Sequence, residues 1–263
     1  MKNSEVIDYL DQTFHPEYQE DYDNSGFLVG SRDDEYKGAL VALDLTEAVV
    51  DEALRLGLNL IVTHHPVIFG GVKRLTADSP LGALLLKLIQ HGMSVYAAHT
   101  NLDNMAWGVS GELAARLGLR ECRVLCESVH GPGIGAGIVG TLPQPVAPDA
   151  FLQQVKTLIG IPTLRTSNMQ DYRRPTLQRV ALCGGSGAEF IADAMAAGAD
   201  IYLSADLKYH DFQRTDGRML LADIGHYESE QFAKDIIFRR ISEKFSNFAC
   251  RISSTQKSLV HYI

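Results

Sequence analysis

Short apolar runs alternate along this chain with segments of helical spacing, and this alternation restricts the fold more than any other feature of the sequence. In the first half of the chain, the apolar runs predict strands at 38–45, 60–62 and 95–98, and the segments between them predict helices at 46–56, 79–90 and 109–117. Thr46 is suited to cap a helix N-terminus, and Gly57 is suited to end a helix. A repeated strand and helix order predicts a largely parallel sheet, with ligand chemistry at the carboxyl ends of its strands.

A glycine-rich stretch at 131–137 interrupts the series and indicates a domain boundary just before it. Beyond it we expect strands at 138–140, 163–165, 180–183, 201–203 and 219–224, and helices at 150–158 and 191–197. A long helix from about 227 to 245 and a strand at 248–252 are expected to return to the first domain. The predicted fold class is α/β with two interlinked α/β domains: residues 1–128 plus about 226–263, with a largely parallel sheet, and an interleaved second domain at 129–225.

Composition and charge exclude several classes of protein. A formal net charge of -8 argues against nucleic-acid binding, which relies on clustered Lys and Arg. The chain shows no secretory leader pattern and no apolar run of the roughly 18 residues that a membrane span needs, so we expect a cytoplasmic protein without membrane contact. The four cysteines have no C-x-x-C spacing, which favours reduced thiols. Cys122 and Cys126 lie in a stretch that resembles a strand or connection, and no other cysteine pair completes a metal site with them.

Histidine and acidic side chains gather at three places, each at the end of an apolar run. The five side chains are His64 and His65 after the second strand, Asp103 after the next strand, and His226 and Glu230 at the start of the long helix. In a parallel sheet, the loop that carries Asp103 is expected beside the histidine pair. His226 and Glu230 are four residues apart on a helix, so their side chains project from one face.

These five side chains form a ligand set for two adjacent metal ions. A bent strand end aimed between two ions would give His64 and His65 one ion each, because neighbours in a regular strand point to opposite faces. Glu230 is suited to bridge the ions, and ion pairs about 3.5 to 4 Å apart are a standard device for activating water. Three histidines, two carboxylates and no thiolate fit two divalent ions of Zn, Mn, Fe, Ni or Co, without selecting among them. The alternatives are a structural histidine pair and a contact on a helix surface.

Other polar residues carry two interpretations each. His99 either has a role at the site, where it would orient a ligand or hold a substrate, or is a strand-end histidine bonded to backbone. Asp206, Lys208 and His210 either belong to the site or form a helix N-terminus with an acidic cap. The glycine-rich run at 184–187 is either an anion-binding turn or a tight turn, and it lacks the G-x-S-x-G pattern of an acyl-transfer serine.

Three strings carry a resemblance to a known family: Ile61-Val62-Thr63-His64-His65-Pro66, Ala98-His99-Thr100-Asn101-Leu102-Asp103 and Gly225-His226-Tyr227-Glu228-Ser229-Glu230. They resemble the NIF-three-like family of dinuclear-metal proteins, whose bacterial members are often labelled GTP cyclohydrolase type 2 homologues. Further strings fit the family pattern at 23–26, 43–46 and 183–187, so the likeness covers nearly the whole chain. Two features depart from it: Ser204-Ala205-Asp206 replaces a Thr-Gly-acid turn, and the chain is too short for the inserted domain of longer members.

The resemblance implies that the positions of His64, His65, Asp103, His226 and Glu230 bind two metal ions. It also implies two interlinked α/β domains and a ring-like homo-hexamer with the metal sites facing an interior cavity. The departure at Asp206 leaves the role of that loop open.

Two hypotheses of function follow. The first is a dinuclear metal-dependent hydrolase that acts through a metal-activated water on a small molecule, with His99 or His210 moving the proton. The label of the family that the chain resembles implies opening of the GTP imidazole ring, as in a GTP cyclohydrolase. The competing reaction is hydrolysis of a phosphoester bond in a nucleotide or similar metabolite. The second is a non-enzymatic metal-binding ring that serves as metallochaperone, sensor or interaction protein. An open coordination position facing a substrate pocket distinguishes the first from the second.

Overall fold

The computed structural model describes residues 1–261 and divides the chain into two compact units. Unit 1 contains residues 1–102 and 233–257, and unit 2 contains residues 103–232 and the C-terminal residues from 258. Each unit has its own sheet and helices, which confirms the predicted α/β class with two interlinked domains. Within residues 1–261, none of the helices combines the length and the apolar character needed to cross a bilayer.

The sheet of unit 1 has five strands in the order β1-β4-β3-β2-β11. The strands are β1 (Gly26–Val29), β2 (Ala39–Ala42), β3 (Leu60–Thr63), β4 (Ser94–Ala97) and β11 (Cys250–Ile252). All neighbours pair in parallel except β1, which runs antiparallel to β4 at the edge. The largely parallel sheet is therefore confirmed, and the carboxyl ends of β2, β3 and β4 share one edge.

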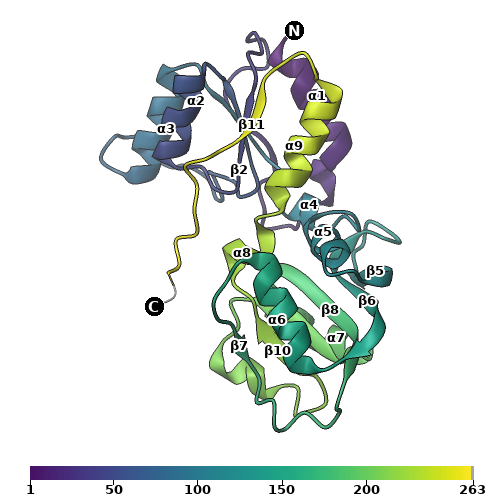
Figure 1. Ribbon diagram of the computed structural model, residues 1–263. Helices are drawn as coiled ribbons and strands as arrows, with labels where there is room; N and C mark the ends of the chain where they lie inside the picture. The colour runs from purple at the N-terminus through teal and green to yellow at the C-terminus, as the bar shows by residue number, and fades with distance from the viewer. Residues whose placement is uncertain (262–263) are drawn as a thin grey trace. The chain divides into compact units, whose positions relative to one another are not determined.

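Helices cover both faces of this sheet (Figure 1). On one side lie α2 (Glu47–Leu56) and α3 (Pro80–Gln90), and on the other α1 (Asn3–Phe14) and α9 (Ala233–Lys244). The side chain of Thr46 accepts a hydrogen bond from the Val49 N–H at the start of α2, and Gly57 ends this helix in the left-handed conformation. Local sequence chemistry thus sets these helix ends as predicted.

The sheet of unit 2 has six strands in the order β5-β6-β8-β9-β10-β7 and mixes parallel with antiparallel pairs. The strands are β5 (Arg120–Glu127), β6 (Gly135–Val146), β7 (Arg165–Thr166), β8 (Leu177–Ser186), β9 (Ile201–Ala205) and β10 (Leu220–Asp223). Only the pairs β8–β9 and β9–β10 are parallel, and the other three pairs are antiparallel. The remaining helices of the unit are α5 (Val109–Arg116), α6 (Pro148–Ile159), α7 (Ile191–Ala196) and α8 (His226–Glu230), with the 3-10 turns η2 (Ala188–Phe190) and η3 (Tyr209–Gln213).

Side chains along the central strands of unit 2 alternate between two cores. Val180 and Leu182 of β8 lie in the core beneath α5 and α6, whereas Ala181 and Cys183 lie in the core beneath α7. Figure 1 shows α6 and α7 on opposite faces of this sheet. Burial on both faces explains why the strand is a continuous apolar run in the sequence.

The long helix expected at 227–245 is interrupted, which corrects the prediction. Its first turns are α8, and the chain continues as α9 after Gln231 and Phe232. Phe232 belongs to the core of unit 2, whereas Ala233 and Ile236 of α9 are buried in unit 1. The apolar residues of this one sequence segment therefore pack in two different hydrophobic cores.

The first division between the units also differs in place from the expected boundary at 128/129. The chain leaves unit 1 after Leu102, because α5 packs on β6 and β8 of the second sheet. The short helix α4 (Thr100–Asp103) spans this crossing. The second crossing falls between Phe232 and Ala233.

Candidate metal centre

Unit 1 gathers three histidines at the carboxyl edge of its sheet. His64 and His65 directly follow β3, and His99 follows β4. One potential ligand nitrogen from each of the three lies within 4.8 Å of the other two. We refer to these three residues as the histidine cluster. His64 is fully buried, and the other two are partly exposed.

Each imidazole of the histidine cluster is held through its Nδ1 atom. His64 Nδ1 lies 2.7 Å from the Ala98 carbonyl oxygen. His65 Nδ1 lies 2.6 Å from Asp44 Oδ1, and His99 Nδ1 lies 2.7 Å from Asp23 Oδ1. A carbonyl oxygen can only accept, so His64 carries its proton on Nδ1, and the carboxylates favour the same tautomer in the other two. The lone pair of each neutral ring is then on Nε2, where a metal ion can bind.

Asp23 is the most strongly held acid of unit 1. Burial alone would raise its pKa, but hydrogen bonds from His99 and Thr100 outweigh burial and hold the pKa of this carboxyl far below its usual range. The Thr100 side chain and backbone N–H both donate to Asp23 Oδ2. The lowered pKa favours the carboxylate form of Asp23, and its hydrogen bond fixes the orientation of His99.

Two exposed aromatic rings lie next to the histidine cluster. The Phe69 ring meets the His99 ring edge-on, with 6.0 Å between their centroids, and the Tyr22 ring lies 6.2 Å from Phe69. Phe69 is 52% and Tyr22 is 63% exposed. The loop after Phe69 carries the exposed cations Lys73 and Arg74. Aromatic faces beside cations suit a planar ring that carries negative charge.

Unit 2 places a carboxylate-rich group at its own end. Carboxylate oxygens of Asp103 and Glu230 lie within 4.8 Å of each other, and Glu230 Oε2 lies 3.0 Å from His226 Nε2. Glu230 is 3% exposed. The hydrogen bond that His226 donates to Glu230 outweighs the effect of burial and raises the pKa of His226 to about 9, with Asp206 adding to the shift. We refer to Asp103, His226 and Glu230 as the unit 2 ligand group.

The glycine run at 184–187 makes room for Glu230. A Cβ atom on Gly185 would lie 2.0 Å from Glu230 Oε1, and the residue has a left-handed φ of +68°. The N–H of Gly184 donates to Ser110 Oγ, and the N–H of Gly185 donates to Ser229 Oγ. These two amides are therefore used to join β8 to neighbouring helices, and the run ends a strand instead of cradling an anion.

Asp206 is the partner of His226 within unit 2. Its Oδ2 lies 2.7 Å from His226 Nδ1 and also accepts a hydrogen bond from the Ser186 hydroxyl. Burial would raise the pKa of Asp206, but these hydrogen bonds lower it. Asp206 adopts a positive φ of 56°, a conformation that aspartate tolerates better than most residues. This geometry gives the Ser204-Ala205-Asp206 turn an orienting role.

His210 and Lys208 lie at the 3-10 turn η3. Lys208 precedes η3 and His210 lies on it, exposed, with its ring 5.2 Å from that of Tyr209. Among residues 1–261, no group of three metal-binding side chains includes His210. Sequence reasoning did not find Asp23 or Asp44 as partners of the histidines, although both lie in strings that carry the family resemblance.

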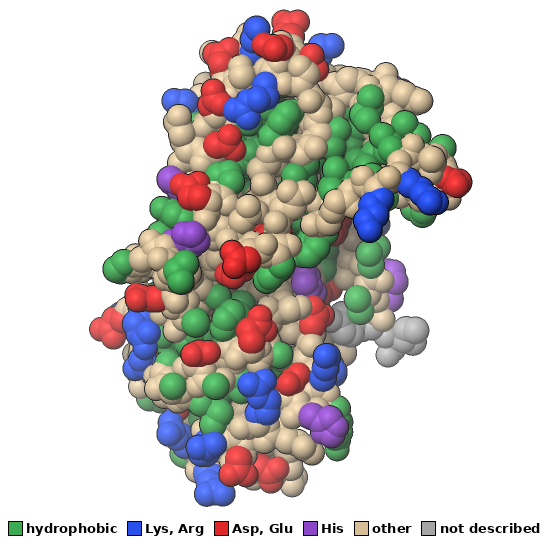
Figure 2. Space-filling model, turned by 180° about the vertical axis from the view of Figure 1, so that it is seen from behind, with side chains coloured by type: hydrophobic (Ala, Val, Ile, Leu, Met, Phe, Trp, Pro, Cys, Tyr) green, Lys and Arg blue, Asp and Glu red, His purple; other side chains and the backbone are tan. Residues whose placement is uncertain are grey.

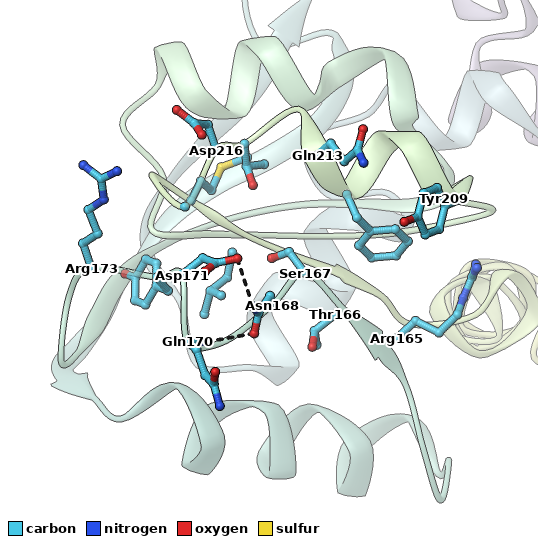
Figure 3. A pocket seen from close by; sticks show the side chains of 16 residues that line it. Arg165, Thr166, Ser167, Asn168, Gln170, Asp171, Arg173, Tyr209, Gln213 and Asp216 are labelled. Atoms are coloured by element: carbon cyan, nitrogen blue, oxygen red, sulfur yellow. Dashed lines mark hydrogen bonds between the residues drawn. The ribbon is translucent and has the colours of Figure 1, made fainter.

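A separate pocket of about 1150 Å³ lies in unit 2 between the 165–173 segment and η3 (Figure 3). Its wall mixes aromatic, amide and charged side chains, including Tyr209, Asn168 and Arg173. Arg165 at one end is held by Asp223 and by the Leu207 carbonyl. None of the predicted metal ligands lines this pocket.

The molecular surface shows no continuous basic area on the face drawn in Figure 2, where acidic and basic side chains are interspersed. Hydrophobic side chains gather on this face of unit 1. A groove of about 530 Å³ in the same unit is lined by Val29, Ile68, Leu85 and Met93, among others.

Comparison with known proteins was made by sequence and by structure. The sequence model of a family described as Duf34/NIF3 (NGG1p interacting factor 3) matches residues 1–258. A protein of Streptococcus pneumoniae serotype 4 named GTP cyclohydrolase 1 type 2 homolog is 37% identical over 240 residues, which cover 90% of this chain and 89% of that protein. A protein of the same name from Clostridium perfringens is 31% identical over 233 residues, which cover 88% of this chain and 87% of that protein.

Solved structures show the same fold. A hypothetical protein of Staphylococcus aureus superposes with a TM-score of 0.88 at 27% identity, covering 100% of this chain and 99% of the other. A Bacillus cereus protein related to NIF3 superposes with a TM-score of 0.92 at 22% identity, again over 100% and 99% of the two chains. At that lower identity the likeness concerns the fold alone.

Proposed function

The chain belongs to the Duf34/NIF3 family, and from this premise we propose that it is a dinuclear metal-dependent hydrolase of small molecules. We propose that His64, His65, Asp103, His226 and Glu230 bind two divalent ions, and that His99 serves the reaction beside them. The metal is one of Zn, Mn, Fe, Ni or Co, in keeping with a set of nitrogen and oxygen donors.

The observation that carries this proposal is the hydrogen bonding of the three imidazoles in unit 1, which is the same in all three. All three use Nδ1 on an oxygen acceptor, and such acceptors behind a ligating histidine are typical of metal sites. Unit 2 offers two carboxylates and one histidine in a second group. The side chains present therefore fit divalent metal ions.

The course of the chain supports the joining of both groups into one centre. The crossing after Leu102 lies between His99 and Asp103, and the crossing after Phe232 lies two residues beyond Glu230. Both ligand groups therefore lie next to the crossings in the sequence. We propose that they bind the two ions together.

The residues of the chain then have distinct roles in hydrolysis. When bound, paired divalent ions lower the pKa of a water molecule and stabilise negative charge on the reacting group. Glu230 would help to hold the ions, while Asp44 and Asp206 orient the imidazoles of His65 and His226. His99, fixed by Asp23, is the residue that would move a proton at its Nε2 atom.

We propose a nucleotide as the substrate. The curated relatives are named as homologues of a GTP cyclohydrolase, and the exposed rings of Phe69 and Tyr22 with Lys73 and Arg74 suit a charged heteroaromatic molecule. Two reactions are consistent with water activation: opening of the GTP imidazole ring, and cleavage of a phosphoester bond. We also propose a homo-hexamer, which light scattering on the purified protein would test.

The deciding experiment is elemental analysis of the purified protein beside a variant that combines His64→Ala and His226→Ala. A screen of nucleotides for hydrolysis follows, with the metal found. About two equivalents of metal, lost in the variant together with any activity, would support the proposal. Bound metal without turnover would favour the metallochaperone, sensor or interaction protein, and absence of metal under every loading condition would refute the metal centre.

A further inference from the structure

Beyond β11, the chain places Gln256 next to a partner of the histidine cluster. Gln256 accepts a hydrogen bond from the Leu43 backbone N–H through Oε1 and donates from Nε2 to Asp44 Oδ2 at 2.8 Å. The other oxygen of Asp44 lies 2.6 Å from His65 Nδ1. A chain of hydrogen bonds therefore leads from Gln256 through Asp44 to the imidazole of His65.

The Gln256 amide has one orientation in this chain. A backbone N–H can only donate, so the amide oxygen faces Leu43 and the amide nitrogen faces Asp44. An N–H bonded to Oδ2 fixes the plane of the carboxylate and leaves Oδ1 directed at His65. Groups that hold a ligating histidine in this way fix its tautomer and increase its basicity.

The three residues before Gln256 are attached to the buried carboxylate of Glu52 on α2. Glu52 accepts hydrogen bonds from the hydroxyls of Ser253, Ser254 and Thr255 at 2.6, 2.7 and 3.1 Å. The N–H of Ser254 also donates to Glu52 at 3.1 Å. Glu52 is 5% exposed, so these bonds replace water around its charge. The segment is thereby held at the end of β2, within reach of Asp44.

We propose that residues 253–256 form a C-terminal clasp, in which Gln256 acts as a positioning residue that sets the metal affinity of His65. The effect on metal affinity rests on the proposed metal centre. The effect on the tautomer of His65 does not, because it depends only on the hydrogen bonds within unit 1.

The first test is a competition between the full-length protein and a chromophoric chelator for Zn²⁺. Gln256→Ala should weaken one of two binding events on the order of tenfold and leave the other unchanged. Gln256→Glu should weaken it further, because an ionised carboxylate cannot donate and repels Asp44. Lys257→Ala is the matched control, since it alters the next, exposed residue of the same segment.

The second test separates positioning from general stability. In an Asp44→Ala background, Gln256→Ala should cause no further loss of affinity, because Gln256 acts through Asp44. In metal-free protein, ¹⁵N NMR of the imidazoles should show His65 protonated on Nδ1, with a shift toward the Nε2–H tautomer in Gln256→Ala.

Several outcomes would overturn the role of Gln256: unchanged affinity, equal weakening of both events, or an undiminished loss in the Asp44→Ala background. An unchanged tautomer of His65 in Gln256→Ala would do the same without reference to metal. A wild-type protein that takes up none of the five divalent metals but whose Gln256→Ala variant shows the tautomer shift would refute the metal centre and keep the positioning role.

Discussion

At the scale of single residues, the backbone of Gly185 in unit 2 lies in close contact with the carboxylate of Glu230. Gly185 has a left-handed φ, and its Cα is close enough to Glu230 that any Cβ would collide with the carboxylate. The requirement for glycine is therefore double, conformational and steric. The same residue decides where a proposed metal ligand can lie.

We predict that Gly185→Ala displaces Glu230 and destabilises the protein by roughly 2–4 kcal/mol, the sum of left-handed strain and overpacking. Gly57→Ala is the matched control, because Gly57 has a φ of +70° with no atom within 4 Å of an added Cβ. Urea unfolding measures the free energies, and metal content measures the site. Equal costs at the two positions, with metal retained, would show that the contact with Glu230 does not matter.

A second residue-scale prediction concerns Phe69. If its ring stacks on a nucleobase, Phe69→Ala should weaken nucleotide binding by about 1–3 kcal/mol, the usual worth of such a contact. Phe69→Leu keeps an apolar side chain without a π face and should lose nearly as much. Calorimetric titration with GTP measures both variants. Full affinity in Phe69→Leu would mean that bulk, and not stacking, is what the site uses.

The proposed ligands could be predicted from the sequence, and their partners could not. His64, His65, His226 and Glu230 stand in short strings at element ends, where local pattern is enough to single them out. Asp44 is 21 residues from His65, and Asp23 is 76 residues from His99, so only the folded sheet brings these pairs together. Asp206, paired with His226 across 20 residues, stood at a departure from the family pattern and received its role only from the structure.

At the scale of elements, burial on both sides of a strand or helix decides what the sequence can reveal. The strands β2, β3 and β4 are short apolar runs between clear helix caps, and their places were predicted to within a few residues. The prediction of a single helix at 227–245 was wrong, because α8 and α9 share one apolar pattern but belong to different units. Hydrophobic periodicity in a sequence indicates that one face of a helix is buried, but it does not indicate which core the face packs against.

The C-terminal clasp supplies an element-scale prediction about pH. Burial alone would raise the pKa of Glu52. Hydrogen bonds from Ser253, Ser254 and Thr255 outweigh burial and lower this pKa from 4.5 to about 2. A folded-state pKa below the unfolded value stabilises the protein above pH 4.5, and this contribution is lost as the pH falls toward 2. It amounts to up to about 3 kcal/mol at neutral pH.

Glu52→Gln should therefore be less stable than wild type at pH 6 by up to this amount, and the difference should shrink at pH 3. Urea unfolding at the two pH values measures it. Glu47→Gln, on the same helix with a side chain that is 76% exposed, is the control. A difference that stays constant with pH would contradict the charge-based account of the clasp.

At the scale of the whole molecule, the two units are separate folding cores that the proposed centre would couple. Each unit has its own hydrophobic cluster, one around β2 and β3 and one around β8 and β9. Ions that bind ligands from both units stabilise both, by about 2.7 kcal/mol at a hundredfold excess over Kd. The fold class and the interlinked pattern were predictable from the order of elements, but the crossing at Leu102 depended on how α5 packs.

We predict that metal raises the unfolding midpoints of both units and that Asp103→Ala, a change in unit 2, removes the shift in unit 1 as well. The single tryptophan, Trp107, reports on unit 2, and hydrogen exchange of the β2 and β3 amides reports on unit 1. Metal that stabilises only one unit would show that the ligands do not act together.

The two crossings of the chain also impose an order of events during protein synthesis. Unit 2 contains nearly all of its residues in one continuous stretch from 103 to 232, so it can fold as soon as that stretch leaves the ribosome. Unit 1 is completed later, although its histidines are translated early, because α9, β11 and the clasp follow unit 2 in the chain. A stop codon between Glu230 and Gln256 would thus leave a chain that contains every proposed ligand but lacks the hydrogen bonds that support His65. We therefore expect the proposed centre to reach its full metal affinity only after the clasp has been translated and has packed on unit 1.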